Sequence, residues 1–410
     1  MARSLDVYLG RERVGLLEQD DSGAMTFRYG ESWLQDPQAV PLSQSLPLKE
    51  EVFNRRECRP FFAGLLPEEE SRKLIAKRFG ISERNDFALL AEIGAECAGA
   101  VSLLSPTENL VAEEGGYHEI SLEELGEKFT QLPRQPLLVG SEGVRLSLAG
   151  AQGKLAVMID DGRYFLPQNG APSTHIIKPQ SPHFEGLAEN EFFCLKLAQE
   201  VGLSVAQVEM SQVGETSFLQ IERYDRVEDG AQRRRRLHQE DFCQALGIPP
   251  EWKYQQEGGP HLKKCFALLR EVSTAPGLDV QALFDAVVFN YLIGNSDAHG
   301  KNFSLILSEQ GTIRLAPLYD LVCTQIYPDL ANELAMKIGK ERKPKRIQSR
   351  DWLKFFEEAG VGKALAARRL KDLAGRVAEA TERKKEEIPH VKKVTELVVD
   401  NCERLLKAEF

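Results

Sequence analysis

Two polar stretches near positions 300 and 320 constrain the fold of this chain more than any other part of its sequence. The first, Asn-Ser-Asp-Ala-His-Gly-Lys-Asn at residues 295–302, holds Asp297 and Asn302, and the second ends in Asp320. The residues between them alternate like a β-hairpin, which would bring Asp320 back to the same point. This spacing of two aspartates and an asparagine is typical of a protein-kinase catalytic centre. We therefore predict that Asp297 orients an attacking hydroxyl, while Asn302 and Asp320 hold Mg²⁺ on nucleotide phosphates.

Composition limits the class of protein further. The chain has 410 residues, enough for two or three domains, and 42% of them are apolar. No apolar run approaches the length of a membrane span, and the N-terminus lacks the apolar core of a signal peptide, so no membrane association is expected. Seven cysteines without CxxC pairs argue against a disulfide framework or a zinc site and favour the cytoplasm. A net charge of −10 disfavours autonomous binding to nucleic acid.

The order of the predicted elements indicates an α+β fold. Residues 4–30 alternate like a β-meander, and residues 136–223 predict strands around one long helix at 187–201. Other helical patterns cover residues 59–79 (with Pro67 near a helix start), 87–93, a short helix after the capping box at Ser121, 239–246, 261–272, 280–293, 349–359, 362–380 and 391–406. A β-rich block before a helical block predicts a bilobal, protein-kinase-like fold with an extra N-terminal module. The predicted domains are a β-rich module (1–105), a linker with a short helix (106–135), an N-lobe with a phosphate loop (136–236) and a helical C-lobe with the catalytic loop (237–410).

A loop of small residues lies between two β-like segments within residues 143–159. Gly150 and Gly153 let backbone N–H groups approach phosphate oxygens, and Lys154 adds a positive charge. The spacing differs from a Walker-type P-loop, which is followed by a helix. The pattern suits a strand–loop–strand phosphate lid, but an ordinary tight hairpin explains the loop equally well when it is taken alone.

Lys178 ends a short apolar strand at residues 173–179. A lysine buried in a strand needs an anionic partner, such as nucleotide phosphates or a carboxylate. Glu191, on the helix predicted at 187–201, is the candidate, as in the strand-lysine to helix-glutamate pair of kinases. The alternative is that Lys178 merely extends its ammonium group to solvent from the strand end.

Residues 218–226 connect the β-rich block to the helical block and predict the hinge of a kinase. Glu222, Arg223 and Tyr224 are then expected to line the nucleotide base. The arginine run 233–236 that follows is better explained as a solvated basic hairpin tip than as a specific contact.

His299 lies two residues after Asp297, a spacing that could ligate a metal in a hydrolase. No second histidine cluster accompanies it in the sequence. A role in shaping the catalytic loop or contacting a phosphate is therefore favoured, with a metallohydrolase as the alternative.

Taken together, these motifs resemble the HipA family of bacterial serine/threonine kinases, toxins of type II toxin–antitoxin pairs. The likeness covers nearly the whole chain. The segments that carry it are residues 90–101, 147–154 (Ser-Leu-Ala-Gly-Ala-Gln-Gly-Lys), 174–178, 236–247, 297–302 and 317–320.

The resemblance implies a kinase that uses ATP and Mg²⁺, with Asp297 as catalytic base and Asn302 and Asp320 as metal ligands. The residues implied to bind the nucleotide are Ala149, Gly150, Ala151, Gln152, Gly153, Lys154, Lys178, Glu222, Arg223, Tyr224, His299, Gly300, Lys301, Asn302, Tyr319 and Asp320. It also implies that Ser147 is autophosphorylated, which expels the loop and silences the kinase.

The resemblance further implies a small helix-turn-helix antitoxin, HipB-like, that binds operator DNA, and an aminoacyl-tRNA synthetase as protein substrate. The chain departs from the family at Gly153, where an acidic residue often precedes the lysine. Basic residues at 337–346 match only loosely a region near operator DNA, and a solvated loop explains them equally well. A catalytically quiet co-repressor is the alternative to an active toxin, and the intact catalytic positions favour the active kinase.

Overall fold

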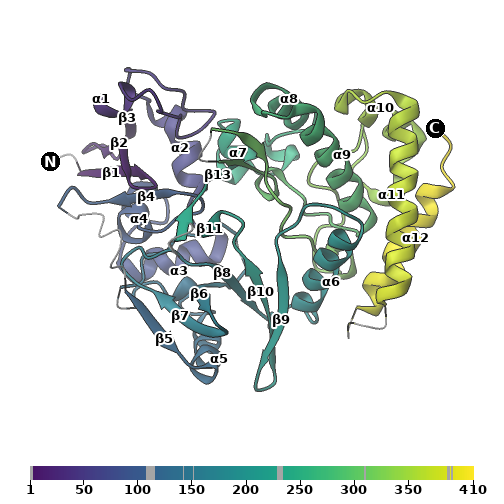
Figure 1. The fold of residues 1–410 in the computed structure, drawn as a ribbon, viewed down its shortest axis with the longest axis horizontal. Coiled ribbons are helices and arrows are strands. Elements are labelled where there is room, and N and C mark those ends of the chain that lie inside the picture. Colours follow the sequence, from purple (N-terminus) through teal and green to yellow (C-terminus); the bar gives the residue numbers. More distant parts are fainter. Residues whose placement is uncertain are drawn as a thin grey trace. The chain divides into compact units, whose positions relative to one another are not determined.

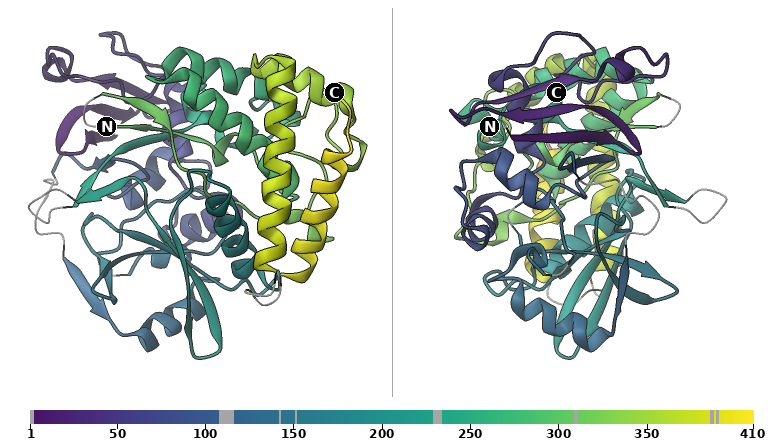
Figure 2. Two further views of the ribbon diagram at one scale, coloured as in Figure 1. Left: turned by 45° about the vertical axis from the view of Figure 1, so that its right-hand side comes forward. Right: turned by 90° about the vertical axis from the view of Figure 1, so that its left-hand side faces the viewer.

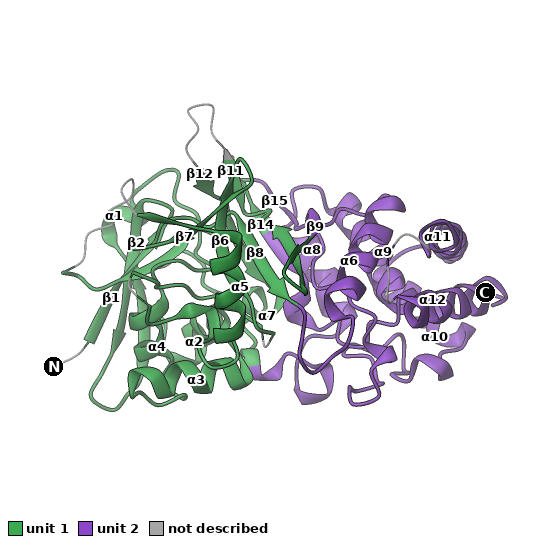
Figure 3. Ribbon diagram, turned by 90° about the horizontal axis from the view of Figure 1, so that it is seen from below, with its two compact units in different colours: residues 1–179, 211–250, 306–311 green, residues 180–210, 251–305, 312–410 purple. Residues whose placement is uncertain are grey.

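The computed structural model describes residues 3–107, 116–141, 143–150, 152–228, 234–308, 311–385, 388 and 391–410. The chain forms two compact units, which Figure 3 shows in different colours. Unit 1 comprises residues 1–179, 211–250 and 306–311, and unit 2 comprises residues 180–210, 251–305 and 312–410. Unit 1 holds most of the strands and unit 2 most of the long helices, which confirms the predicted α+β class.

A four-stranded antiparallel sheet begins unit 1 (Figure 1), with strand order β3-β2-β1-β4. Its strands are β1 (Arg3–Leu9), β2 (Glu12–Gln19), β3 (Met25–Tyr29) and β4 (Val101–Leu104), with the helices α1 (Glu31–Leu34), α2 (Arg55–Gly64), α3 (Glu69–Phe79) and α4 (Asp86–Ile93). The predicted β-meander is confirmed. The helical stretch predicted at 59–79 is instead two helices, because Pro67 lies in the break between α2 and α3 and supplies no N–H.

A six-stranded sheet follows, in the order β5-β7-β6-β8-β10-β9. Its strands are β5 (Tyr117–Ile120), β6 (Leu155–Asp160), β7 (Arg163–Pro167), β8 (His175–Pro179), β9 (Val208–Val213) and β10 (Thr216–Glu222). Beside them lie α5 (Leu122–Gln131), which starts at the predicted capping box of Ser121, and the 3₁₀ turn η1 (Pro136–Leu138). The strand expected before the phosphate loop is absent from the described residues, where Leu146 makes a single parallel bridge to Glu96.

The end of unit 1 corrects the helix predicted at 239–246. Strands β11 (Arg226–Glu228) and β12 (Arg234–Arg236) form a ribbon, and β13 (His238–Asp241) precedes a shorter helix, α7 (Phe242–Ala245). The Asp241 side chain accepts a hydrogen bond from the backbone N–H of Gln244, 2.8 Å, and so caps α7. A helix does not continue backwards through its N-cap, so the residues before Asp241 are free to form a strand.

Unit 2 packs long helices around aromatic side chains. Its helices are α6 (Leu187–Glu200), α8 (Leu262–Val272), α9 (Pro276–Leu292), α10 (Ser349–Ala359), α11 (Lys363–Lys384) and α12 (Lys392–Leu406), all close to their predicted positions. Short turns η2 (Pro250–Trp252), η3 (Gln255–Glu257), η4 (Gly300–Asn302), η5 (Thr324–Ile326) and η6 (Pro344–Arg346) and strands β14 (Ser304–Leu307) and β15 (Ile313–Leu315) complete the elements. Helices α11 and α12 run side by side, as the left view of Figure 2 shows. Helix α9 is buried along most of its length, so the segment that follows it starts from a fixed position.

All seven cysteines are free thiols and buried. Among the described residues, no helix has the length and apolar content that crossing a bilayer requires.

Candidate active site

The predicted catalytic loop starts where α9 ends, in unit 2. Gly294 turns the chain with a φ of +70°, and a Cβ there would lie 2.5 Å from a methyl carbon of Leu397. The next side chain, Asn295, donates to the Oδ1 of Asn290 on α9 (2.8 Å) and to the backbone carbonyl of Asp320 (3.3 Å). Asn295 therefore ties the loop to both the helix before it and the segment that carries the second aspartate.

Asp297 is exposed at the tip of this loop, and its position is set by two neighbours. Its backbone N–H donates to the Oδ1 of Asn295, 3.0 Å, and its Oδ1 accepts a hydrogen bond from the Tyr254 hydroxyl, 2.7 Å. The Tyr254 ring also meets the His299 ring edge-on, with centroids 5.2 Å apart. The structure thus adds Tyr254, which sequence reasoning missed, to the residues around the candidate base.

Asn302 and Asp320 lie side by side, as the hairpin spacing predicted. The Nδ2 of Asn302 donates to the Oδ2 of Asp320 over 3.4 Å, and its Oδ1 accepts from the backbone N–H of His299, 3.1 Å. Asp320 has a φ of +52°, a left-handed conformation that aspartate tolerates and that concentrates at functional sites. A carboxylate beside an amide carbonyl is the hard-oxygen donor set that suits Mg²⁺.

The neighbours of Asn302 hold the rest of the loop. The Tyr319 hydroxyl donates to the backbone carbonyl of Lys301, 2.7 Å, and is 2.6 Å from the Ser304 Oγ. Gly300 N–H donates to the carbonyl of Lys253, 3.4 Å. His299 and Lys301 are buried. Within the described residues, no three His, Cys, Asp or Glu side chains gather as a metal cluster.

The predicted phosphate loop lies in unit 1, and its predicted modification site is enclosed. Ser147 is 0% exposed; its Oγ donates to the Leu65 carbonyl, 2.7 Å, and its N–H donates to the Glu96 carbonyl, 2.8 Å. Further on, the Lys154 ammonium donates to the Ala149 carbonyl, and Gly150 passes beside it with a φ of +105°. Ala151 lies outside the described residues, whereas Gln152 and Gly153 continue the loop to β6.

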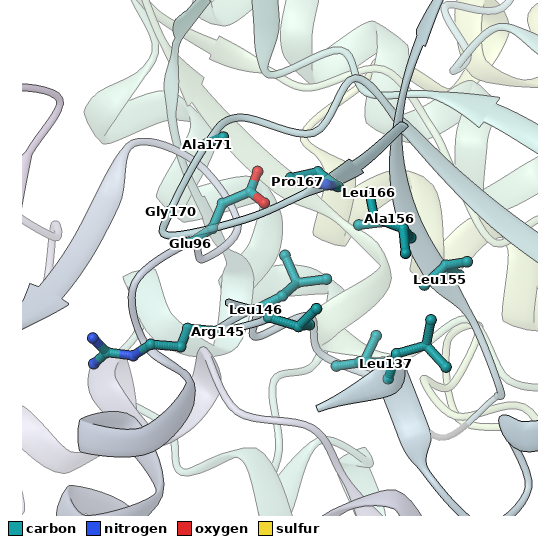
Figure 4. A pocket seen from close by; sticks show the side chains of 12 residues that line it. Glu96, Leu137, Arg145, Leu146, Leu155, Ala156, Leu166, Pro167, Gly170 and Ala171 are labelled. Atoms are coloured by element: carbon teal, nitrogen blue, oxygen red, sulfur yellow. The ribbon is translucent and has the colours of Figure 1, made fainter. Parts of the chain in front are cut away.

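A small cavity lies behind this loop (Figure 4). Leu137, Leu146, Leu155 and Leu166 are among its lining residues, and its volume is about 10 Å³. That volume accommodates about one water molecule and is far too small for a nucleotide. Arg145 points away from the cavity, and its guanidinium donates to the Ala91 carbonyl at the end of α4, 2.7 Å. The loop is therefore anchored on the N-terminal module of the chain.

The predicted nucleotide lysine and hinge also lie in unit 1. Lys178 is buried on β8, where it pairs with Leu219 of β10. Glu191 is buried on α6 of unit 2, and its pairing with Lys178 stays a prediction. In the hinge, Glu222 is exposed and the Tyr224 hydroxyl donates to the Gln239 side chain.

Arg223 belongs to a buried ion network that the sequence did not reveal. Arg223 and Arg226 both bond to the Glu96 Oε1, at 3.3 and 3.0 Å, and both bond to the Asp225 Oδ2, at 2.9 Å. Burial alone would raise the pKa of Asp225, but the two guanidinium charges hold it well below its ordinary value. The Glu96 Oε1 also accepts from the backbone N–H of Ser173, 2.8 Å. The side chain of Arg223 is therefore occupied, so any contact from Arg223 to a base has to come from its backbone.

The arginine run is not uniformly solvated, contrary to the sequence-based interpretation. Residue 233 lies outside the described residues, and Arg235 is exposed. Arg236 is half-buried and donates to the Ser102 hydroxyl, and burial lowers its pKa to about 10. Arg236 is therefore a structural contact of β4.

Comparisons with known proteins add to this geometry. The HipA N-terminal domain profile matches residues 5–104, and the HipA-like C-terminal domain profile matches residues 146–384. The protein Y4mE of Sinorhizobium fredii is 48% identical over 386 residues, which span 93% of this chain and 91% of that protein. The serine/threonine-protein kinase toxin HipA of Shewanella oneidensis is 31% identical over 391 residues, 92% of this chain and 88% of the toxin. A solved Shewanella oneidensis complex of HipA, HipB and operator DNA matches with a TM-score of 0.85 and 28% identity, covering 99% of this chain and 100% of that one.

Proposed function

The chain belongs to the HipA family of serine/threonine kinases, and from that premise we propose that it transfers the γ-phosphoryl group of ATP to a protein hydroxyl. The observation that carries the proposal is the arrangement in unit 2. Asp297, an exposed carboxylate, lies on a short loop and is held by hydrogen bonds to Tyr254 and Asn295. The same loop places Asn302 against Asp320. A base next to a pair of oxygen donors is what phosphoryl transfer requires from the protein.

Each group has a distinct task in the proposed reaction. Asp297 accepts a hydrogen bond from the acceptor hydroxyl and aligns it for in-line attack. Asn302 and Asp320 would hold Mg²⁺, which neutralises the phosphate charge when it is bound. The residues proposed to contact the nucleotide are Lys178, residues 149–154, Glu222, Arg223, Tyr224, His299, Gly300, Lys301 and Tyr319.

We further propose that the kinase is a growth-inhibiting toxin that silences itself at Ser147. A fully buried hydroxyl bonded to a backbone carbonyl cannot carry a phosphate without leaving its place. Phosphorylation adds about −1.5 to −2 charges, so a modified loop could not return to the enclosed site. A HipB-like antitoxin and operator DNA are the proposed partners, because the solved relative assembles with both. An aminoacyl-tRNA synthetase is the proposed substrate.

The test is transfer of ³²P from labelled ATP in the presence of Mg²⁺. The wild-type chain is expected to label itself, with the phosphate on Ser147 by mass spectrometry. Asp297→Asn is expected to lose transfer by 10²-fold or more, since positioned bases contribute about 10²–10⁴-fold, while its thermal unfolding stays unchanged. Undiminished labelling of Asp297→Asn would reject the assignment of the base. A wild-type chain without any transfer, yet bound to its antitoxin, would favour the quiet co-repressor.

A further inference from the structure

A basic segment of unit 2, residues 333–346, is joined directly to the catalytic loop. The backbone N–H of Ala335 donates to the carbonyl of Ser296, the residue before Asp297, over 2.8 Å. Gln255 bridges to the same segment: its N–H donates to the Ala335 carbonyl, 3.1 Å, and its Oε1 accepts from the Lys337 N–H, 2.8 Å. The segment therefore borders the place where a phosphoryl acceptor would meet Asp297.

The charge of this segment opposes that of the chain as a whole. Its six cations are Lys337, Lys340, Arg342, Lys343, Lys345 and Arg346, and its two acids are Glu333 and Glu341, so its net charge is 6 − 2 = +4 in a chain of net charge −10. Glu333 pairs with Arg342 and Lys343, and the Glu341 carboxylate accepts the backbone N–H groups of those same two residues. Among the described residues, Lys337, Lys340, Lys345 and Arg346 have no ion-pair partner. Lys340, Lys345 and Arg346 are exposed and Lys337 is half-buried, so this segment presents positive charge to a binding partner.

Besides the basic segment, a second segment of unit 2 contacts the catalytic loop, and it contains an exposed tryptophan. Trp252 is 51% exposed, whereas Trp33 and Trp352, the other two tryptophans, are buried. It lies two residues before Tyr254, whose hydroxyl bonds to Asp297. Its backbone is held by a tight turn, because the Gly259 N–H donates to the Tyr254 carbonyl, 3.0 Å, and a Cβ on Gly259 would lie 2.2 Å from the Trp252 carbonyl oxygen. Tryptophan is among the residues enriched at the energetically dominant positions of protein interfaces.

From these observations we propose that Trp252, Lys337, Lys340, Lys345 and Arg346 form a docking surface for an acidic acceptor segment of the protein substrate. This proposal rests on the proposed kinase function and names the class of substrate. Glutamate or aspartate near the phosphorylated residue would pair with the cations, and an apolar side chain would pack on the indole. Complementary charge selects partners and speeds their encounter, and its effect falls with salt. The tryptophan and the joint with the catalytic loop favour an acceptor peptide over nucleic acid.

The experiment measures peptide binding to the full chain with Mg²⁺ and a non-hydrolysable ATP analogue. The probes are two fluorescein-labelled peptides of 13 residues with a central serine and one leucine, one rich in glutamate and the other with every glutamate replaced by glutamine. Fluorescence anisotropy is expected to show about 10-fold tighter binding of the acidic peptide at low salt, a gap that closes near 0.5 M NaCl. The acidic peptide should also protect Trp252, which dominates the acrylamide-accessible emission, from quenching.

Variants separate this surface from charge elsewhere. Lys340→Gln/Lys345→Gln should weaken the acidic peptide at least 3-fold, whereas the matched control Lys392→Gln/Lys393→Gln, on exposed positions of α12, should leave its affinity unchanged. Trp252→Ala should weaken both peptides. Equal affinity for the two peptides, no effect of the Lys340/Lys345 pair, or stronger competition by duplex DNA than by the acidic peptide would overturn the proposal.

A parallel assay with labelled ATP tests the kinase function and the docking surface separately. Acidic peptide that binds as expected but never receives phosphate would count against the kinase function and leave the docking surface standing. Peptides phosphorylated with no preference for acidic residues would support the kinase and reject the docking surface.

Discussion

At the scale of single residues, the side chain of Asp297 is oriented by a tyrosine rather than by its own loop alone. The Tyr254 hydroxyl donates to one carboxylate oxygen of Asp297 over 2.7 Å, and this bond helps to set the direction of the carboxylate. We expect Tyr254→Phe to lower kcat by roughly 10- to 100-fold, since a hydrogen bond to a charged group contributes about 1.5–3 kcal/mol. KM for ATP and the thermal unfolding temperature should stay unchanged, because the ring and its edge contact with His299 remain. Steady-state kinetics decide: a rise in KM for ATP with unchanged kcat would contradict a role in orienting the base.

Tyr254 could not be predicted as part of the site from the sequence, whereas the three polar residues could. Asp297, Asn302 and Asp320 could be grouped because a short loop and a hairpin determine their separation along the chain. Tyr254 lies 43 residues before Asp297, in a stretch of 3₁₀ turns without a periodic pattern. Only tertiary contacts, such as the bond from Gly300 N–H to the Lys253 carbonyl, bring it to the loop.

At the scale of elements, Glu96 joins segments that are distant in the sequence. Its carboxylate bonds to Arg223, Arg226 and the Ser173 backbone, and its carbonyl accepts from the Ser147 N–H. We expect Glu96→Gln to lower the free energy of unfolding by about 3–5 kcal/mol, because it leaves two buried guanidinium groups with one carboxylate. Urea unfolding measures the change. The matched control, Glu92→Gln on the exposed face of α4, should stay within about 0.5 kcal/mol, and a comparable loss there would contradict the argument.

Most long elements could be predicted because their periodicity is local, as in α6, α8 and α10. The elements that were predicted wrongly depend on specific hydrogen bonds, which do not show in the hydrophobic periodicity. Residues 239–246 have helical spacing, but the Asp241 side chain caps α7 and leaves β13 before it. The segment before the phosphate loop alternates like a strand, yet its bonds go to Glu96 rather than to a neighbouring strand of the sheet. The ion pairs between Glu96 and the hinge arginines could not be predicted, because neither the sequence around Glu96 nor that of the hinge shows a pattern that indicates them.

At the scale of the whole molecule, one compact unit contains the matched N-terminal domain of the family and part of the matched C-terminal domain. Unit 1 includes the N-terminal domain at 5–104 and the start of the C-terminal domain. Ser43, from the first, donates its hydroxyl to the carboxylate of Glu240, from the second, and the Gln44 N–H donates to the same group, 2.9 Å. Loss of either domain would therefore leave buried polar groups of the other without their partners.

The Glu240 contact makes the stability of this unit depend on pH. Burial raises the pKa of Glu240 to about 8, against the opposing hydrogen bonds from Ser43 and Gln44, whereas the unfolded value is about 4.3. Below pH about 4 the Glu240 carboxyl group is protonated in both the folded and the unfolded chain, and its contribution to the free energy of unfolding is fully present. Between pH about 4 and 8 the unfolded chain loses the proton first, so stability falls by up to about 1.4 kcal/mol per pH unit.

Glu240→Gln removes this titration, so the variant should gain stability relative to wild type as pH rises from 5 to 8. Thermal unfolding at several pH values measures the difference between the two melting temperatures, which we expect to grow by several degrees, since 1 kcal/mol shifts the Tm by about 2–4 °C in a unit of this size. Other titrating groups, such as Asp225, cancel in that difference because both proteins contain them. The control Glu215→Gln, exposed in the turn after β9, should give a difference independent of pH. Parallel curves for wild type and Glu240→Gln would mean that the Glu240 carboxylate ionises freely in the folded chain, and that its bond to Ser43 joins the two domains as a charged contact.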